Sequence, residues 1–449
     1  MPVCVFCSYT LLRPLTAFCE RSFKVFLAVF LSFLSTMKEL RLFQRVVTSV
    51  VIATTATIGG FVAKVQAATS TLPISLAVKV TGVDTVRDLY GVDGTGITIG
   101  VISDSFDSAP SSLNAEGKPD TYNSDIANGY LPSGIQVLKD YFGPNATDEG
   151  RGILELIHAV APGAGLAFYS VAGSDNVFNY STGIQALSAA GAKIIVDDRS
   201  FLPAVLPNVP GEIPTEIADR EPPDGPINQA IDSVVAQGVS YFSSAGNFKT
   251  GFPDVGGPSL PIYGHRNNPA ALTVGSVYYG RLANVLLREQ FEVQQGDLEP
   301  FSSAGNPDLP FMKPDVVAPD GLSISFQLCD ATQYSCDFNP SNFDSGFYDL
   351  FGTSASAPFT AAVAALLLQA DPSATPSEIY DALRRTAKPL EGETGFNLES
   401  GYGLIEADEA ISALGLKPKS VPEPSEALAL LCCAVLGNAL FLKRTQKKP

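Results

Sequence analysis

The chain has 449 residues, of which 45% are hydrophobic and 17% are charged, with 39 glycines and 33 prolines. This composition predicts a globular, loop-rich protein with a sizeable core. The formal net charge is −17, and both ends are basic, so the middle of the chain is more acidic still. An acidic surface repels nucleic acid and anionic lipid, which excludes nucleic acid as a partner.

The N-terminal residues predict export. Residues 37–67 form a complete signal peptide, with a positive start, the apolar stretch 46–62 and small residues near Ala67. Residues 1–36 hold another apolar stretch and fit no signal pattern. We interpret them as an upstream extension or a mis-assigned start; a membrane segment is the alternative. The protein is therefore expected in the cell envelope or outside the cell.

Short β-branched strands alternate with helices in the middle of the chain. The expected strands are Ile97–Ser103, Gly165–Ser170, Ala192–Val196, Val239–Ala245 and Leu272–Val277, and the expected helices are Glu149–Val160, Asn179–Ala190, Pro226–Gln237 and Pro358–Gln369. This alternation predicts an α/β fold, a mostly parallel sheet with helices on both faces. Ligands of such sheets bind at the carboxyl ends of the strands. No glycine-rich phosphate motif is visible, so no cofactor is expected.

The segment 352–358, Gly-Thr-Ser-Ala-Ser-Ala-Pro, places Ser354 just before a long apolar helix. A hydroxyl at a helix N-terminus lies in the positive end of the helix dipole, which favours negative charge developing beside it. Pro358 is expected at the helix start, where its missing amide sacrifices no hydrogen bond. Ser354 is therefore a candidate nucleophile. The alternative is a helix-capping serine.

Histidine and cysteine are scarce. The chain has two histidines, His158 and His265, so an imidazole is not expected to activate Ser354. Both are interpreted as structural or surface residues. Between the terminal segments only Cys329 and Cys336 remain, and a small-loop disulfide is the natural interpretation in an oxidising compartment. No metal site is expected.

The C-terminal residues 421–449 contain Val-Pro-Glu-Pro, an apolar stretch at 427–442 and a basic end. These three parts, in this order, resemble the PEP-CTERM sorting signal of exported Gram-negative and cyanobacterial proteins. The resemblance implies a sorting machinery as a partner. It also implies membrane contact only through the terminal segments.

Four segments resemble the subtilases. They are the strand 94–105, which ends near an aspartate; Ser-Ala-Gly-Asn at 244–247; Gly-Thr-Ser with Ala-Pro at 352–358; and the closing stretch 401–407. They fall in the order of that family and cover residues 85–415, which we expect to form one peptidase domain. The resemblance implies a subtilisin-like fold, a polypeptide substrate and an oxyanion-hole role for Asn247.

The histidine of the subtilases is missing. Where they carry His-Gly-Thr-His, this chain has Asp-Glu-Gly-Arg-Gly-Ile at 148–153. This pattern is similar to the sedolisins, serine-carboxyl peptidases with a glutamate on the same helix, and it implies that Glu149 is the base. The sedolisin pattern is incomplete, because Ile153 stands where a paired aspartate is expected and Asn247 replaces an aspartate.

A second carboxylate must then come from elsewhere. Asp104, at the end of the first strand, is the preferred candidate, although Ser103 aligns with the subtilase aspartate without a gap. Asp107 is the fallback, and the pair Asp197-Asp198, directly after the strand 194–196, is a third source in the same cleft. Asp104 would orient Glu149 or hold a shared proton with it.

Glutamate is a weaker base than histidine by about two pKa units. Burial and a neighbouring carboxylate raise the pKa of a glutamate, which recovers part of the lost driving force. The sequence therefore predicts an exported serine-type endopeptidase that favours acidic pH. An inactive binding module at the cell surface is the alternative, since the missing histidine and Ile153 are both consistent with lost activity.

Overall fold

The computed structural model describes residues 72–109, 112–114, 116–144, 146–173, 177–199, 225–249, 260–280, 293–328 and 347–419. The expected upstream extension, signal peptide, sorting segment and Cys329–Cys336 pair lie outside these residues. These expectations, and the expected domain boundaries, stay predictions.

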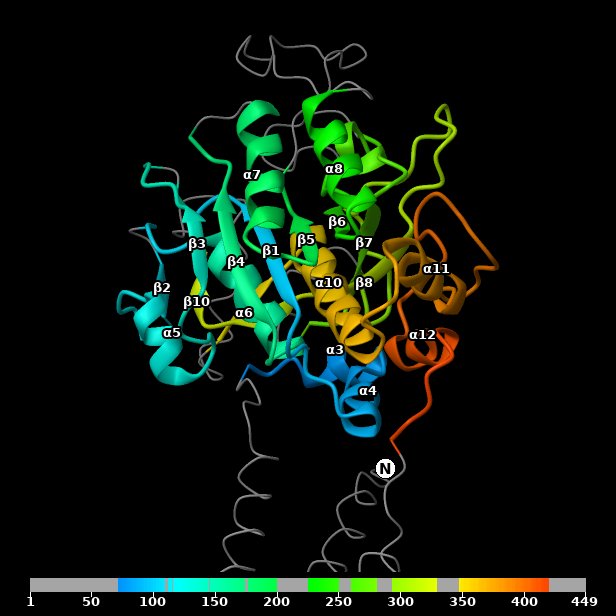
Figure 1. Cartoon of the computed structure of the whole chain (residues 1–449), viewed down its shortest axis with the longest axis horizontal. Helices are drawn as coiled ribbons and strands as arrows, with labels where there is room; N and C mark the ends of the chain where they lie inside the picture. The colour runs from blue at the N-terminus through cyan, green and yellow to red at the C-terminus, as the bar shows by residue number, and fades with distance from the viewer. Residues whose placement is uncertain are drawn as a thin grey trace, which may run out of the picture. The chain divides into compact units, whose positions relative to one another are not determined.

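A seven-stranded sheet forms the centre of the described part of the chain (Figure 1). Its order is β3-β4-β1-β5-β6-β7-β8, and every neighbouring pair is parallel. The strands are β1 Thr98–Ser103, β3 Gln136–Lys139, β4 Gly165–Ser170, β5 Ile194–Asp197, β6 Ser240–Ser244, β7 Leu272–Tyr278 and β8 Val316–Asp320. Two small antiparallel pairs flank the sheet: β2 Leu113–Asn114 with β10 Phe326–Gln327, and β9 Leu322–Ile324 with β11 Tyr348–Leu350.

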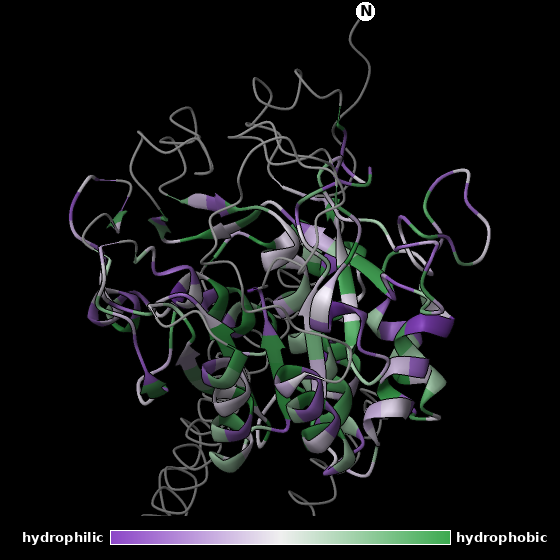
Figure 2. Cartoon of the chain, turned by 90° about the horizontal axis from the view of Figure 1, so that it is seen from above, coloured by the Kyte–Doolittle hydropathy of each residue, from purple (hydrophilic) through white to green (hydrophobic). Residues whose placement is uncertain are grey.

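Helices cover both faces of this sheet, as the sequence predicts. One face packs against α7 Val177–Ala189 and α8 Pro226–Ala236, which lie side by side in Figure 1. The other packs against α4 Val83–Tyr90, α6 Glu149–Val160, α10 Thr353–Ala370, α11 Pro376–Thr386 and α12 Ala407–Ala413. The remaining described helices are α3 Ser75–Val80, α5 Tyr122–Asn128 and the short η1 Gly264–Asn267. Figure 2 shows hydrophobic strands in the centre and hydrophilic residues on outer turns and loops.

The long helix α10 lies in the larger of these cores. Among the described residues it is the one helix long and apolar enough to cross a membrane, but 89% of it is buried inside the protein. Its residues Thr353 to Leu368 are all buried. We therefore interpret α10 as the central core helix.

The expected elements agree closely with the observed ones, with one correction. The helix at Glu149–Val160 and the strand at Gly165–Ser170 have the predicted bounds. The helix expected to start at Pro358 begins at Thr353, which puts the proline inside it. Because proline has no N–H, the carbonyl group of Ser354 lacks the helical hydrogen bond that residue 358 would usually donate. The expectation that Pro358 sacrifices no hydrogen bond is therefore wrong.

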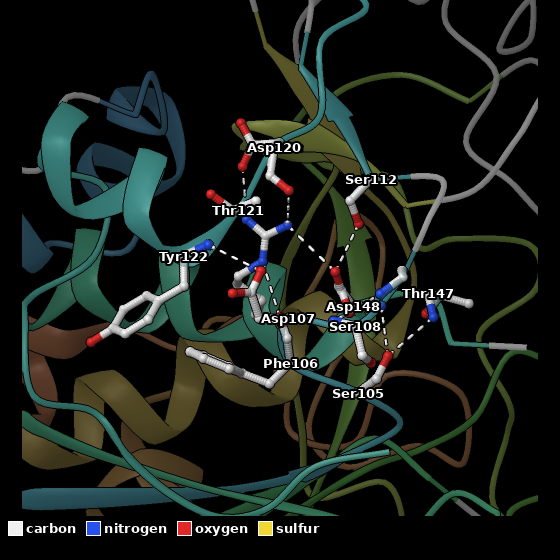
Figure 3. Close-up of polar contacts among 12 residues, drawn as sticks. Ser105, Phe106, Asp107, Ser108, Ser112, Asp120, Thr121, Tyr122, Thr147 and Asp148 are labelled. Atoms are coloured by element: carbon white, nitrogen blue, oxygen red, sulfur yellow. Dashed lines mark hydrogen bonds and ion pairs between the residues drawn. The ribbon is translucent and has the colours of Figure 1, made fainter. Parts of the chain in front are cut away.

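A buried charged cluster joins the start of α6 to the loops before it. Arg151, whose side chain is fully buried, forms ion pairs with Asp120 at 2.7 Å and with Asp125 at 2.6 Å. Asp148 lies 3.5 Å from the same guanidinium and accepts hydrogen bonds from Ser108 and Ser112. Figure 3 shows Asp120, Asp148 and the loop residues converging on this point.

Glu155, on the same helix as Arg151, also belongs to this cluster, and two of the cluster's acids hold their protons more tightly than usual. Burial raises the pKa of Asp125 to about 6, against the attraction of Arg151. Burial and the charge of Asp125 raise the pKa of Glu155 well above its ordinary value. Glu155 accepts hydrogen bonds from the backbone and side chain of Ser325.

We predict that Asp125 makes the fold more stable in acid. Its pKa is about 6 in the folded state and 3.8 without the fold, so the folded protein binds more protons between these values. Its contribution is fully present below about pH 4 and is lost as the pH rises through 6. The loss should amount to about 3 kcal/mol of unfolding free energy.

Denaturant unfolding of the wild type and Asp125→Asn, measured from pH 3.5 to 7.5, checks this. His158 acts with the opposite sign, because burial lowers its pKa to about 4, but it is present in both proteins. The difference between the two curves therefore reports Asp125 together with the part of the Glu155 titration that depends on the charge of Asp125. A difference that does not change with pH would contradict the prediction.

Candidate active site

Ser354 lies at the N-terminus of α10, as the second residue of the helix. The turn before it depends on Gly352, whose φ is 92°, a left-handed conformation that favours glycine. The Gly352 N–H donates to Asp320 at 2.8 Å, which fixes the turn to the end of β8. Ser354 is 9% exposed, so its hydroxyl lies at the edge of the core.

Asn247 lies beside this turn, just after the end of β6. Its Oδ1 accepts hydrogen bonds from the N–H and the Oγ1 of Thr353, both at 3.0 Å. A Cβ added to Gly352 would lie 2.5 Å from Asn247 Nδ2, so the amide nitrogen faces the backbone next to Ser354. The structure thus brings together the predicted nucleophile and the predicted oxyanion donor.

Glu149 is the first residue of α6, and it interacts with Ser354. Burial and the charge of Asp104 raise the pKa of Glu149, while the charge of Arg199 and hydrogen bonds with Ser354 and Asp198 lower it. The residue keeps partial solvent exposure. A carboxyl group therefore does lie within contact range of the serine, as the sequence predicts.

Asp104 also lies near Glu149, but its hydrogen bonds reach Glu149 only through Thr147. Its Oδ2 accepts from the N–H and Oγ1 of Thr147, at 2.9 and 2.6 Å. The Thr147 Oγ1 in turn accepts from the Glu149 N–H at 3.2 Å. Asp104 acts on the Glu149 carboxyl through its charge and holds the backbone of Glu149 through Thr147.

Asp198, the residue after β5, is a second carboxyl group that interacts with Glu149. Its Oδ2 accepts from Ser103 at 3.0 Å. The parallel register pairs Ile102 with Asp197, which brings Ser103 beside Asp198. Burial and the charge of Glu149 raise the pKa of Asp198 well above its ordinary value.

The fallback Asp107 does not belong to this site. It is exposed, and its carboxylate accepts from the N–H of Tyr122 at 3.1 Å (Figure 3). Asp197 also faces elsewhere: it accepts from Ser243 at 2.7 Å and lies 3.4 Å from His265.

Both histidines are buried structural residues in the described part of the chain. His265 lies in η1, where its Nε2 is 3.3 Å from the Tyr180 hydroxyl. His158 is on α6, and burial lowers its pKa to about 4, so the ring is neutral at ordinary pH. The sequence already indicates this, because His158 is nine residues after Glu149, on the opposite face of the helix, and His265 lies in no matching motif.

A search of the described ranges for a metal site gives no group of three or more His, Cys, Asp or Glu side chains arranged to hold an ion.

Comparison with protein families matches residues 94–403 to the Subtilase family. The match covers more than half of the chain, and the chain belongs to the subtilase family. That family assignment agrees with the parallel sheet and with the placement of Ser354 and Asn247.

Individual relatives match over short stretches. A probable subtilase-type serine protease of Deinococcus radiodurans is 37% identical over 81 residues, 18% of this chain and 11% of that one. Fervidolysin of Fervidobacterium pennivorans is 42% identical over 67 residues, 15% of this chain and 9% of the relative. The matches thus span about a tenth of the length of these relatives.

Solved structures are similar over more of the chain at low identity. The crystal structure of MycP1 without its N-terminal propeptide has a TM-score of 0.47 at 19% identity, covering 78% of this chain and 99% of that one. The crystal structure of fervidolysin has a TM-score of 0.43 at 19% identity, covering 77% and 46%.

Proposed function

We propose that the protein is a serine-type endopeptidase in which a carboxylate replaces histidine as the base. The observation that carries the proposal is the interaction of the Ser354 hydroxyl with the Glu149 carboxyl group, at a helix N-terminus and beside Asn247. A pairing of nucleophile, base and amide donor is what acyl transfer to serine requires. A purely structural serine has no need of it.

Each residue has a defined task in this reaction. Glu149 accepts the Ser354 proton as Oγ attacks the peptide carbonyl, and the Ser354 N–H and Asn247 Nδ2 donate to the resulting oxyanion. Glu149 then gives the proton to the leaving amine. Water attacks the acyl-serine by the reverse sequence, which frees the acid product and restores both groups.

The second carboxyl group of the pair is Asp198 in this proposal. Asp198 and Glu149 interact with each other, and the pKa of each is raised by burial and by a neighbouring acidic charge. Such a pair retains one proton over a wide pH range, because two like charges in contact cannot both ionise easily. Asp198 would hold that proton while Glu149 acts as base, and Asp104 would position Glu149 through Thr147.

Activity is then expected in acidic solution, with a bell-shaped pH profile. At the lowest pH both carboxyl groups are protonated and no base remains. At high pH the pair loses its shared proton, and with it the neutral partner that keeps Glu149 oriented. Activity therefore requires the singly protonated pair.

We predict that Asp198→Asn lowers kcat by about 10- to 100-fold and removes the alkaline limb of the pH profile. Asparagine keeps a hydrogen bond to Glu149 but cannot lose a proton. Asp197→Asn is the matched control, since Asp197 is the buried neighbour that faces Ser243 and His265 instead. Rates of peptide hydrolysis from pH 3 to 8 check this; an unchanged profile in the Asp198 variant would contradict it.

The proposed substrate is polypeptide, and the proposed place of action is the cell envelope or the outside of the cell. The signal peptide at 37–67 and the PEP-CTERM-like segment at 421–449 support this proposal, with export and C-terminal sorting machinery as partners. An acidic surface is consistent with an exported protein that avoids nucleic acid and anionic lipid.

The test uses the protein with its signal peptide removed. An unspecific peptide library is incubated with it from pH 3 to 8, and a fluorophosphonate is added in parallel to label an activated serine. We expect cleavage in acid and a mass increase on the peptide that contains Ser354. No cleavage at any pH together with no label would overturn the proposal and leave the binding module as the function.

A further inference from the structure

Arg266, on the short helix η1, is a buried cation without a counter-ion among the residues that the structure describes. It is 2% exposed, and its Nε and Nη1 have no hydrogen-bond partner. Only Nη2 is engaged, through long contacts of 3.4 Å with the Asp198 carbonyl oxygen and 3.3 Å with the Ser244 hydroxyl. A buried guanidinium with unmet donors is costly unless something pairs with it.

The guanidinium spans two strand ends that border the candidate active site. Asp198 follows β5 and Ser244 ends β6, and these strands are parallel neighbours. Ligands of parallel sheets bind at this edge. Arg266 is thus fixed beneath the same edge that carries Asp198, Asn247 and Ser354.

The free end of Arg266 faces the residue next to the oxyanion donor. A Cβ added to Gly246 would lie 2.4 Å from Nη1, so any larger residue there would press against the guanidinium. The rings of Phe248 and Tyr263 lie 5.9 and 5.6 Å from the guanidinium carbon, which gives the cation apolar, aromatic neighbours. A charge in such surroundings interacts strongly with an anion that reaches it.

We infer that Arg266 recognises an acidic side chain of the substrate, so that the protein cleaves polypeptides after Asp or Glu. This inference rests on the proposed function. With the reacting carbonyl carbon at Ser354 Oγ and its oxygen at Asn247 Nδ2, the side chain of the same residue begins at Cβ, three bonds from that oxygen, and Gly246 directly precedes Asn247 in the chain. A carboxylate on that side chain matches the planar donors of the guanidinium, which bind carboxylates in a bidentate manner.

Binding to Ser354→Ala separates this inference from the chemistry. Peptides that differ only in ending with Glu or Gln are titrated into this variant at pH 6, with calorimetric detection. We expect the Glu peptide to bind at least about 10-fold more tightly. The preference should disappear as the pH falls below about 4, because the peptide carboxyl group then becomes neutral.

Arg266→Gln in the same background should reduce the Glu-to-Gln ratio to about one. Arg384→Gln is the matched control, since Arg384 pairs with Asp315 just before the start of β8, at the opposite edge of the sheet from the carboxyl ends of the strands. If the Arg266 variant does not fold, the pH dependence of peptide binding by Ser354→Ala still tests the inference. Equal binding of the two peptides at pH 6 would overturn the inference.

The set of peptide bonds that the wild type cleaves tests the peptidase activity and the acidic preference separately. Cleavage after residues of every kind would leave the peptidase standing and refute the acidic preference. Selective binding of Glu peptides without any cleavage would refute the peptidase and support the recognition by Arg266. Cleavage mainly after Asp and Glu supports both.

Discussion

Replacement of Ser354 by alanine is expected to reduce kcat for peptide hydrolysis by roughly four to six orders of magnitude. The substitution removes the oxygen that forms the acyl intermediate, whereas Glu149, Asp198 and Asn247 remain in place. Substrate affinity should change little, because the hydroxyl contributes little to binding the ground state. Single-turnover and steady-state measurements at the optimal pH check the split between kcat and KM.

Ser356→Ala is the matched control for this substitution. Ser356 is two residues further along α10, and its hydroxyl donates to the Ala318 carbonyl at 2.9 Å inside the core. Its loss should lower stability by about 1 kcal/mol and leave kcat near the wild-type value. If Ser354→Ala retained more than a few per cent of wild-type activity, another nucleophile would have to be sought.

Replacement of Glu149 by glutamine is expected to lower kcat by about three to four orders of magnitude. Glutamine keeps the size of the side chain and can still contact Ser354, but it cannot accept the proton. The acid limb of the pH profile should also disappear, since that limb reports the protonation of this base. Rates measured from pH 3 to 8 provide both readouts.

Glu155→Gln is the control for Glu149→Gln. Glu155 lies on the same helix and is also a buried carboxyl group of raised pKa, but it bonds Ser325 rather than Ser354. Its replacement should leave kcat and the pH profile of activity near those of the wild type. Wild-type kcat in the Glu149 variant would show that the base lies elsewhere.

Much of the fold could be predicted because local signals agreed with the tertiary structure. The central strands are continuous apolar stretches, and α6 has the predicted bounds because helical periodicity starts at Glu149 and ends before Ala161-Pro162. Two strands of the sheet were not predicted. β3 Gln136–Lys139 is an exposed edge strand without a buried face, and β8 Val316–Asp320 contains a proline.

The start of α10 could not be predicted from local sequence. Pro358 favours a helix start, but the observed start is set by contacts distant in sequence: Gly352 with Asp320, and Thr353 with Asn247. These hydrogen bonds extend the helix five residues upstream and include the serine in its first turn. The position of Ser354 in the first turn of α10 therefore depends on tertiary contacts.

Candidates for the nucleophile, the base and the amide donor could be named from the sequence because each lies in a recognisable motif. The choice between Asp104 and Asp198 could not be made in this way. It depends on the pairing of β1 with β5, which puts Asp198 beside Ser103, and on the turn that directs Asp104 to Thr147. Arg266 lies in no recognisable motif. Its proposed role depends on its contacts with the ends of β5 and β6, which only the tertiary structure brings together.

Helix α6 carries the proposed base at its first residue, and Arg151 and Glu155 of the acid-stabilised cluster follow on the same helix. Alkalinisation would therefore weaken the support of the base at the same time as it ionises the carboxyl pair. On the proposed function, a rise from acidic to neutral pH would lower the unfolding free energy and the rate of hydrolysis together.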